Sequence, residues 1–317
     1  MSLTRKLRKR MTVGLLKWGQ ELTQKGDFER VERLRKILLG TTRLAIPLRK
    51  RLERNMKLAG VYEPHLIDAH FERAVDQIIM IAHVCRAGFA DSGCAELFCF
   101  DDSFKLLEQA YAKGRGVINI APHICGYPVY APVVSTRIPC VMYLRRNKDP
   151  QKMQLNIAIG KIGQGQLIYP PEGATKAQRL GVAIDVLRQG KMMFITIDTP
   201  RKSHQGTAVT IYDRTTYFPT GVFIMSLRTG APVVPVTWHW EDGKYHIHYD
   251  EPIELQRGGN LKRKAMIATQ EWARGVDEYL HQYPEMWWNW LDKRWTKIIR
   301  NHYAPKPEAA SARVITR

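Results

Sequence analysis

The fold of this chain is decided by the stretch Gly116-Val117-Ile118-Asn119-Ile120-Ala121-Pro122-His123-Ile124-Cys125. Its first half is short, apolar and β-branched and lies between a glycine and a proline, which predicts a buried strand. A histidine follows the strand, ahead of a turn that contains Gly126. Open α/β sheets place their chemistry at the carboxyl ends of their strands. His123 is therefore the first candidate for a functional residue, although a histidine here can also simply donate to a backbone carbonyl.

Beyond residue 116 the pattern alternates between strands and helices, which predicts an α/β sheet with helices packed over it. The expected strands are 117–121, 140–144, 166–169, 192–198, 208–212, 233–240 and 245–249. The expected helices are 150–162, 174–189, 220–228 and 261–282. The segment 241–244, Glu-Asp-Gly-Lys, is a hairpin signal between the last two strands. The sheet is therefore expected to be mixed but mostly parallel.

Residues 1–110 differ because helix-forming residues dominate and apolar side chains recur every three or four positions. Helices are expected within 31–52 and over 65–88, and a further one over 104–113 leads into the strand at 117. The sequence thus predicts an N-terminal helical section over 1–110, an α/β domain over 111–303 and a disordered tail over 304–317.

The net charge of +19 is unevenly distributed. Residues 1–57 hold 17 lysines and arginines against 5 acidic residues, which predicts an anionic partner such as a membrane surface, a nucleic acid or an acidic substrate. Lys17 interrupts the apolar run near the N-terminus, and neither a transmembrane helix nor a signal peptide is indicated. The five scattered cysteines form no CxxC pair, which favours a reducing compartment.

Several short segments, in this order and spacing, are similar to one protein family. They are Arg54-Asn55-Met56-Lys57-Leu58, the strand and turn at His123, Tyr143-Leu144-Arg145-Arg146, Phe218-Pro219-Thr220-Gly221, Ser226 to Val236, and Tyr283 to Trp290 with Arg294-Trp295. Together they resemble the lysophospholipid acyltransferase superfamily, and within it the late acyltransferases of lipid A assembly, which transfer lauroyl or myristoyl groups. The resemblance spans roughly residues 40–297.

This resemblance implies an acyltransferase-like fold and transfer of a fatty acyl group from a thioester donor, acyl-ACP or acyl-CoA, to a hydroxyl or amine of a lipid or glycolipid. It implies no cofactor and no metal, and it places the protein peripherally on an anionic membrane, at the cytoplasmic face of the inner membrane. His123 would be the general base. The family has an acid five positions after this histidine, where the chain has Pro128. Since a base needs a partner that fixes its tautomer and stabilises its charged form, either another acid replaces it or the activity is weak, altered or lost.

Two acids are candidates for that role. Glu172 lies in Pro-Pro-Glu-Gly-Ala-Thr, which resembles the Pro-Glu-Gly-Thr block of glycerol-phosphate acyltransferases, where Glu and Gly help to bind the acceptor phosphate. Gly173 is accordingly a candidate substrate-binding residue. Glu172 can alternatively favour the start of the following helix through the helix dipole. Asp198 ends the strand predicted over 192–198, and its alternative role is to cap Thr199-Pro200.

Arg145 and Arg146 follow another strand, and their guanidinium groups suit phosphate or carboxylate groups of donor or acceptor, unless they are solvated surface charges. Backbone N–H groups in the turn after His123, including that of Gly126, are expected to contact the substrate by stabilising its oxyanion. Cys125 is a weaker candidate for a thiolate nucleophile, because a small buried cysteine explains it better.

Two further groups of residues invite a functional reading. His239, His246 and His248 fall on two strands, but no carboxylate or cysteine completes a clear metal site, so histidines on a sheet surface are the simpler explanation. Four tryptophans interleaved with basic residues near the C-terminus suit a membrane interface. Packing against the domain is expected for at least half of them.

Two other classes of function compete with catalysis. Pro128 favours an inactive relative that binds lipid or acyl carrier, and the charge alone favours a nucleic-acid-binding module, although no nucleic-acid-binding motif accompanies it. The sequence leaves the acyl chain length, the donor carrier, the acceptor and the oligomeric state open.

Overall fold

A computed structural model describes residues 28–87, 93–143, 166–256 and 258–300. The N-terminal helices are α2 (Phe28–Leu44), α3 (Ile46–Ala59) and α4 (Pro64–Ala87). The later helices are α5 (Phe104–Ala112), α6 (Tyr127–Ser135), α8 (Lys176–Arg188), α9 (Gly221–Thr229), α10 (Leu261–Gln282) and α11 (Lys293–Arg300). Short 3₁₀ turns are η2 (Cys94–Leu97), η3 (Ser203–Gln205), η4 (Pro284–Met286) and η5 (Trp288–Leu291).

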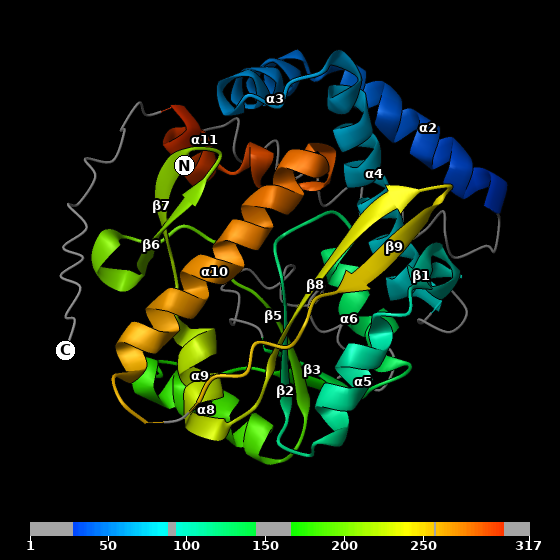
Figure 1. Ribbon diagram of the computed structural model, residues 1–317. Coiled ribbons are helices and arrows are strands. Elements are labelled where there is room, and N and C mark those ends of the chain that lie inside the picture. Colours follow the sequence, from blue (N-terminus) through cyan, green and yellow to red (C-terminus); the bar gives the residue numbers. More distant parts are fainter. Residues whose placement is uncertain (1–27, 88–92, 144–165, 257, 301–317) are drawn as a thin grey trace.

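The described strands form a seven-stranded sheet in the order β1-β9-β8-β2-β5-β3-β4 and a separate β6-β7 hairpin. The large sheet contains β1 (Phe98–Phe100), β2 (Val117–Ala121), β3 (Cys140–Tyr143), β4 (Gln166–Ile168), β5 (Met192–Thr196), β8 (Val233–Glu241) and β9 (Lys244–Tyr249). Only the β8–β9 pair in it is antiparallel. In Figure 1, α8, α9 and α10 lie on one side of the strands and α5 and α6 on the other. The predicted mixed, mostly parallel α/β fold is confirmed.

The strand β2 lies at the centre of the sheet, and all five of its residues are buried. It pairs in parallel with β8 on one side and with β5 on the other, where Ala121 is opposite Thr196. Gly116 precedes it with φ of 71°, and a Cβ at this position would come within 2.5 Å of the backbone oxygen of Leu187. A glycine is therefore required where the strand passes the end of α8.

The helix α6 is absent from the sequence-based assignment, because prolines at 128 and 132 argue against a helix. Gly126 precedes α6 in a left-handed conformation, with φ of 93°. Pro128 falls in the first turn of the helix, where a proline needs no intrahelical hydrogen bond. The position of the family's acid is thus occupied by a residue that suits the start of α6.

Two strands were also not predicted. β1 lies inside the section expected to be helical, and it is only three residues long. β7 (Arg214–Phe218) pairs with β6 (Thr207–Ile211) through a turn at Tyr212 and Asp213, whose φ angles are 51° and 56°. Such turns usually carry Asn or Gly, so this hairpin lacked its usual signal. The predicted hairpin at 241–244 is confirmed, with Glu241 opposite Lys244. The helix expected over 150–162 and the tail from 304 lie outside the described residues.

The C-terminal tryptophans lie mainly inside the protein. Trp287, Trp290 and Trp295 are fully buried, and Trp288 is only partly exposed. Their rings pack against one another, with centroids 5.0 Å apart for the pair 287–290 and 4.7 Å apart for the pair 287–295. The expectation that at least half of the four tryptophans pack against the domain is confirmed, and the three buried side chains have no surface to offer to lipid.

Candidate active site

His123 lies two residues beyond the end of β2, and its side chain forms an ion-pair contact with Asp198. Asp198 follows β5 by two residues, so the two side chains come from neighbouring parallel strands. The Nδ1 of His123 is hydrogen-bonded to one carboxylate oxygen of Asp198. Because a carboxylate only accepts, Nδ1 is the donor in this bond, and in the neutral imidazole Nε2 is then the nitrogen that can accept a proton. The imidazole is thus held in the tautomer that a general base requires.

Asp198 itself is almost completely buried, with 1% of its surface exposed. Its second carboxylate oxygen accepts hydrogen bonds from Asn289 Nδ2 at 2.8 Å and from Trp287 Nε1 at 3.2 Å. Trp295 Nε1 donates to its backbone oxygen at 3.1 Å. Burial opposes ionisation, but the attraction of His123 and these hydrogen bonds outweigh it and lower the pKa of Asp198 below its usual value. The residue is therefore an ionised, fully hydrogen-bonded partner for the imidazole.

The backbone around His123 is tied to the segment that carries Trp287. His123 O accepts from Trp288 N at 2.9 Å, and Cys125 N donates to Met286 O at 2.8 Å. This short antiparallel bridge joins Ile124 to Trp287. One segment thus fixes both halves of the pair, since it also provides the hydrogen bonds to the Asp198 carboxylate.

The helix α4 contacts the turn that follows His123. Gln77, which is buried, accepts a hydrogen bond from Gly126 N at 2.8 Å. One turn of helix earlier, Arg73 stacks its guanidinium over the Trp240 ring, 3.8 Å from the centroid. Near the start of α4, His70 is hydrogen-bonded through Nδ1 to the backbone oxygen of Glu285. A buried polar face of α4 therefore contacts both segments that build the site.

The amides of the turn after His123 are already engaged. Ile124 N donates to Pro122 O, Cys125 N to Met286 O, Gly126 N to Gln77 and Tyr127 N to Ile124 O. They are not free to bind a developing oxyanion in this arrangement, which corrects the role expected for them. Tyr127 instead packs its ring edge-on against the imidazole, with centroids 5.0 Å apart.

Cys125 is fully buried, and burial raises the pKa of its thiol well above the ordinary value. A thiol that stays protonated at neutral pH is a poor nucleophile. The geometry thus agrees with the interpretation of Cys125 as a small core residue.

Glu172 and Gly173 occupy an exposed turn before α8. The helix itself is capped by Thr175, whose side chain accepts from Gln178 N in a reciprocal capping box. The acid that contacts His123 is Asp198, so the structure does not bring Glu172 to the imidazole. Arg145 and Arg146 lie outside the described residues.

The three histidines of the β8–β9 hairpin lie on its two paired strands, and only His248 is exposed. His239 and His246 are opposite each other, with ring centroids 5.6 Å apart, and His248 contacts Asp101 at 2.8 Å. Within the described part of the chain, no group of three or more His, Cys, Asp and Glu residues is arranged to hold a metal ion.

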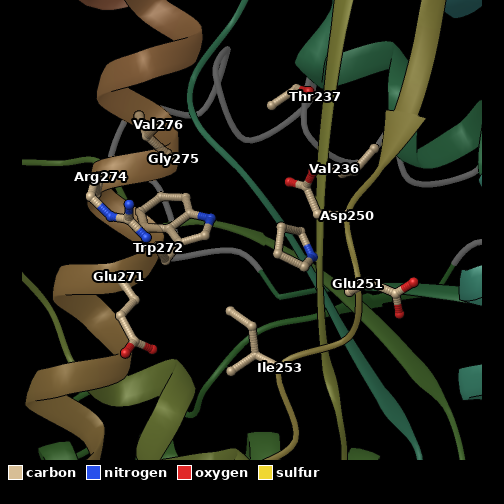
Figure 2. A pocket seen from close by; sticks show the side chains of 11 residues that line it. Val236, Thr237, Asp250, Glu251, Ile253, Glu271, Trp272, Arg274, Gly275 and Val276 are labelled. Carbon is tan, nitrogen blue, oxygen red and sulfur yellow. The ribbon is translucent and has the colours of Figure 1, made fainter.

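A surface pocket lies away from these residues, between the N-terminal half of β8, the segment that follows β9, and α10. Figure 2 shows Trp272 and Ile253 on its walls, with the carboxylates of Asp250, Glu251 and Glu271 around it. None of the predicted site residues lines this pocket. The contact between His123 and Asp198 lies instead beyond the ends of β2 and β5.

Sequence reasoning missed three contributors to the site. Thr196 Oγ1 is 2.9 Å from His123 Nε2, and Trp287 and Asn289 hold the carboxylate of Asp198. For Thr196 a signal was present, because residues two apart on a strand point to the same side, and Thr196 precedes Asp198 by two. Trp287 and Asn289 are separated from Asp198 by 89 and 91 residues, and a local sequence pattern cannot predict contacts over such a distance.

A family model described as bacterial lipid A biosynthesis acyltransferase matches residues 48–297. The chain belongs to this family. The matched region begins in α3 and ends in α11, and it includes His123, Asp198, Trp287 and Asn289. The resemblance predicted from the sequence is confirmed. A search of curated proteins gave no match.

Membership in the lipid A biosynthesis acyltransferase family supports an enzyme that transfers an acyl group to a lipid acceptor. Among the described helices, none has both the length and the apolar character needed to cross a bilayer.

Proposed function

We propose that this lipid A acyltransferase family member moves a fatty acyl group from acyl-ACP or acyl-CoA to a hydroxyl or amine of a lipid or glycolipid. His123 acts as general base, and Asp198 replaces the acid that the family carries at the position of Pro128. The observation that supports this most is the contact of His123 with a buried, ionised carboxylate. Asp198 accepts the hydrogen bond from Nδ1, which orients Nε2 toward the acceptor, and stabilises the imidazolium that forms when His123 takes the acceptor's proton.

A buried aspartate is costly unless its charge is compensated. Here two side-chain N–H donors and the imidazole compensate the negative charge of Asp198. Several contacts thus stabilise its ionised form. The same contact gives His123 the oriented partner that a general base needs. The arrangement therefore favours catalysis over the alternative of an inactive lipid- or acyl-carrier-binding protein.

We further propose that the junction of α2 and α3 rests on the cytoplasmic surface of the inner membrane. Leu44 and Ile46 are 80% and 56% exposed, with Leu48 beside them. Arg43 and Lys50, both exposed, flank these apolar side chains. Apolar residues with basic neighbours suit an interface with anionic lipid.

The position of α3 relative to the site agrees with a lipid acceptor. Asn55 of α3 is fully buried and donates to the backbone oxygen of Trp290 at 2.9 Å. In Figure 1, α2 and α3 lie along the edge of the molecule toward which β2 runs. A membrane bound at this junction would therefore face the end of the sheet that carries His123.

Mass spectrometry of lipids tests the proposed activity. Extracts from cells lacking the gene are compared with extracts from cells that carry the wild-type gene or His123→Ala. We expect one acylated lipid to disappear on deletion and to return only with the wild type. Equal restoration by His123→Ala would contradict the role of His123 and favour the binding protein.

A further inference from the structure

A threonine hydroxyl lies on the nitrogen of His123 that would act as the base. Thr196 Oγ1 is 2.9 Å from Nε2, whereas the Asp198 carboxylate contacts Nδ1, the other ring nitrogen. In the neutral imidazole Nδ1 is the donor to Asp198, so the threonine hydroxyl donates and Nε2 accepts. A hydroxyl of the protein therefore fills the position at Nε2 in this structure.

Strand geometry holds this hydroxyl in place. Thr196 is the last residue of β5 and pairs with Ala121 of β2. His123 follows Ala121 by two residues and Asp198 follows Thr196 by two, and side chains two apart on a strand project to the same side. β5 is paired with β3 on its other edge, so Thr196 belongs to an interior strand of the sheet.

The acceptor of the acyl group needs the same place on the imidazole. A general base must lie within hydrogen-bond reach of the proton that it takes. Nε2 has a single lone pair, and Thr196 occupies it. The acceptor hydroxyl or amine must therefore displace Oγ1 before it can give its proton to His123. Both residues are partly exposed, so an acceptor can approach them.

The displaced hydroxyl supplies a donor that the turn after His123 does not offer. Attack on a thioester turns its carbonyl oxygen into an oxyanion, and donors aimed at such an oxyanion are a large source of catalysis. The backbone amides of residues 124–127 are all engaged within the protein. The oxyanion forms on the carbon that the acceptor attacks, so it lies next to the atom bound at Nε2. A rotation about the Cα–Cβ bond of Thr196 moves its hydroxyl off Nε2 and leaves it within reach of that oxyanion.

We propose that Thr196 is a catalytic residue of the acyl transfer, which yields Nε2 of His123 to the acceptor and donates its hydroxyl hydrogen to the oxyanion of the tetrahedral intermediate. This inference rests on the proposed function and adds to it the group that stabilises the transition state. In the free protein the same hydroxyl occupies the place that the acceptor takes during the reaction.

The acceptor gives its proton to Nε2 as its oxygen or nitrogen attacks the carbonyl carbon of the thioester. The electron pair of the carbonyl bond moves to the oxygen, which accepts a hydrogen bond from Thr196. When the carbonyl bond forms again, the carbon–sulfur bond breaks, and the leaving thiolate takes the proton from Nε2 to become a thiol. Thr196 keeps its own proton and forms no covalent bond, and Asp198 remains ionised throughout.

Three variants test the role of the hydroxyl. Thr196→Val keeps the shape of the side chain without its donor, and we expect kcat to fall about 10²- to 10³-fold while KM for the acyl donor stays within about threefold. Thr196→Ser restores the hydroxyl and should keep at least about a tenth of the wild-type kcat. Thr237→Val replaces a partly exposed threonine of β8 in the same sheet and is the matched control. Initial rates with dodecanoyl-CoA or dodecanoyl-ACP and membrane lipid give these values, and circular dichroism checks the fold.

Two donor analogues separate binding of the oxyanion from positioning of the imidazole, and both are built on the carrier, CoA or ACP, that the wild type accepts. The first is a dodecyl thioether, which has no carbonyl. The second has a trifluoromethyl ketone in place of the thioester, and its tetrahedral hydrate resembles the intermediate. Thr196→Val should weaken binding of the ketone by about the factor by which it lowers kcat and leave binding of the thioether unchanged, because a donor to the oxyanion acts on the transition state alone. Isothermal titration calorimetry gives both dissociation constants.

Three results would overturn the inference. If Thr196→Val has a kcat within about threefold of the wild type, or if it loses turnover but binds the ketone as tightly as the wild type does, Thr196 does not hold the oxyanion and the proposed function stands. Equal weakening of both analogues would assign Thr196 to binding of the acyl donor instead. If the folded wild type transfers no dodecanoyl group, the proposed function has failed and the role of Thr196 fails with it.

Discussion

Asp198 touches His123 across 75 residues of sequence, and the same carboxylate is held by Trp287 and Asn289 from a third part of the chain. The acid is thus fixed independently of the histidine that it orients. A substitution that removes the charge of Asp198 but keeps its size can therefore be expected to leave the side chain in place.

Asp198→Asn keeps the size of the side chain and removes its charge. Without a carboxylate, His123 loses both its fixed tautomer and the partner of its imidazolium, so we expect the rate of acyl transfer to fall about 10²- to 10⁴-fold. Initial rates with dodecanoyl-CoA measure this, and circular dichroism checks the fold. Asp185→Asn, on the exposed surface of α8, is the control. An Asp198→Asn rate close to that of the wild type would remove Asp198 from the mechanism.

Glu172→Gln separates the two acids that the sequence offered. Glu172 is exposed and lies in a turn before α8, whereas Asp198 contacts the imidazole. We expect a rate within about threefold of the wild type, as for a surface substitution. A loss as large as that of Asp198→Asn would show that Glu172 reaches the reacting groups during catalysis.

His70 makes stability depend on pH. Burial lowers the pKa of His70 from 6.5 to about 4, and a hydrogen bond to the Glu285 backbone only partly opposes this. His70 is therefore protonated near pH 6.5 in the unfolded chain but only near pH 4 in the folded protein. Stability is fully present above that window and falls as the pH drops through it, by up to about 3 kcal/mol.

The substitution His70→Gln tests this linkage, because glutamine does not titrate. Thermal unfolding at pH 7 and pH 5 should give a smaller difference in Tm for His70→Gln than for the wild type. His65→Gln, an exposed histidine of the same helix, should behave like the wild type. An unchanged pH dependence in His70→Gln would assign the acid sensitivity to other groups.

Aspartate substitutions test whether the protein surface at the α2–α3 junction binds the membrane. Leu44→Asp combined with Ile46→Asp places anions where apolar side chains are exposed, and we expect binding to anionic vesicles to weaken at least about tenfold. The matched control is Met266→Asp with Ile267→Asp, an exposed apolar pair on α10. Vesicle pelleting gives the affinities. Equal loss in both double variants would mean that the junction has no special part in binding.

The fold could be read from the sequence where local patterns are strong. The helix expected over 261–282 and the strand over 117–121 have the predicted bounds, because their periodicity is unambiguous. α6 was missed because its prolines are tolerated only at the helix start and against a well-packed core. β7 was missed because its turn uses Tyr212 and Asp213 in a left-handed conformation.

The site was predictable only in part, for a related reason. His123 and Asp198 each follow a strand, which the sequence indicates, and both were candidates. That β2 and β5 are neighbours is a property of the sheet order, since β3 and β4 lie between them in the chain. The choice between Glu172 and Asp198 depended on this order, and so did the recognition of Thr196.

The hydrogen bonds between Asp198 and residues 287–295 have a consequence for biosynthesis. A ribosome that has made the chain as far as Asp198, two residues beyond β5, has produced the histidine, the threonine and the aspartate, but none of the indole and amide groups that donate hydrogen bonds to the aspartate. The nascent protein at that point lacks these contacts. On the proposed mechanism, acyl transfer requires a chain synthesised beyond Asn289, when most of the polypeptide has already been made.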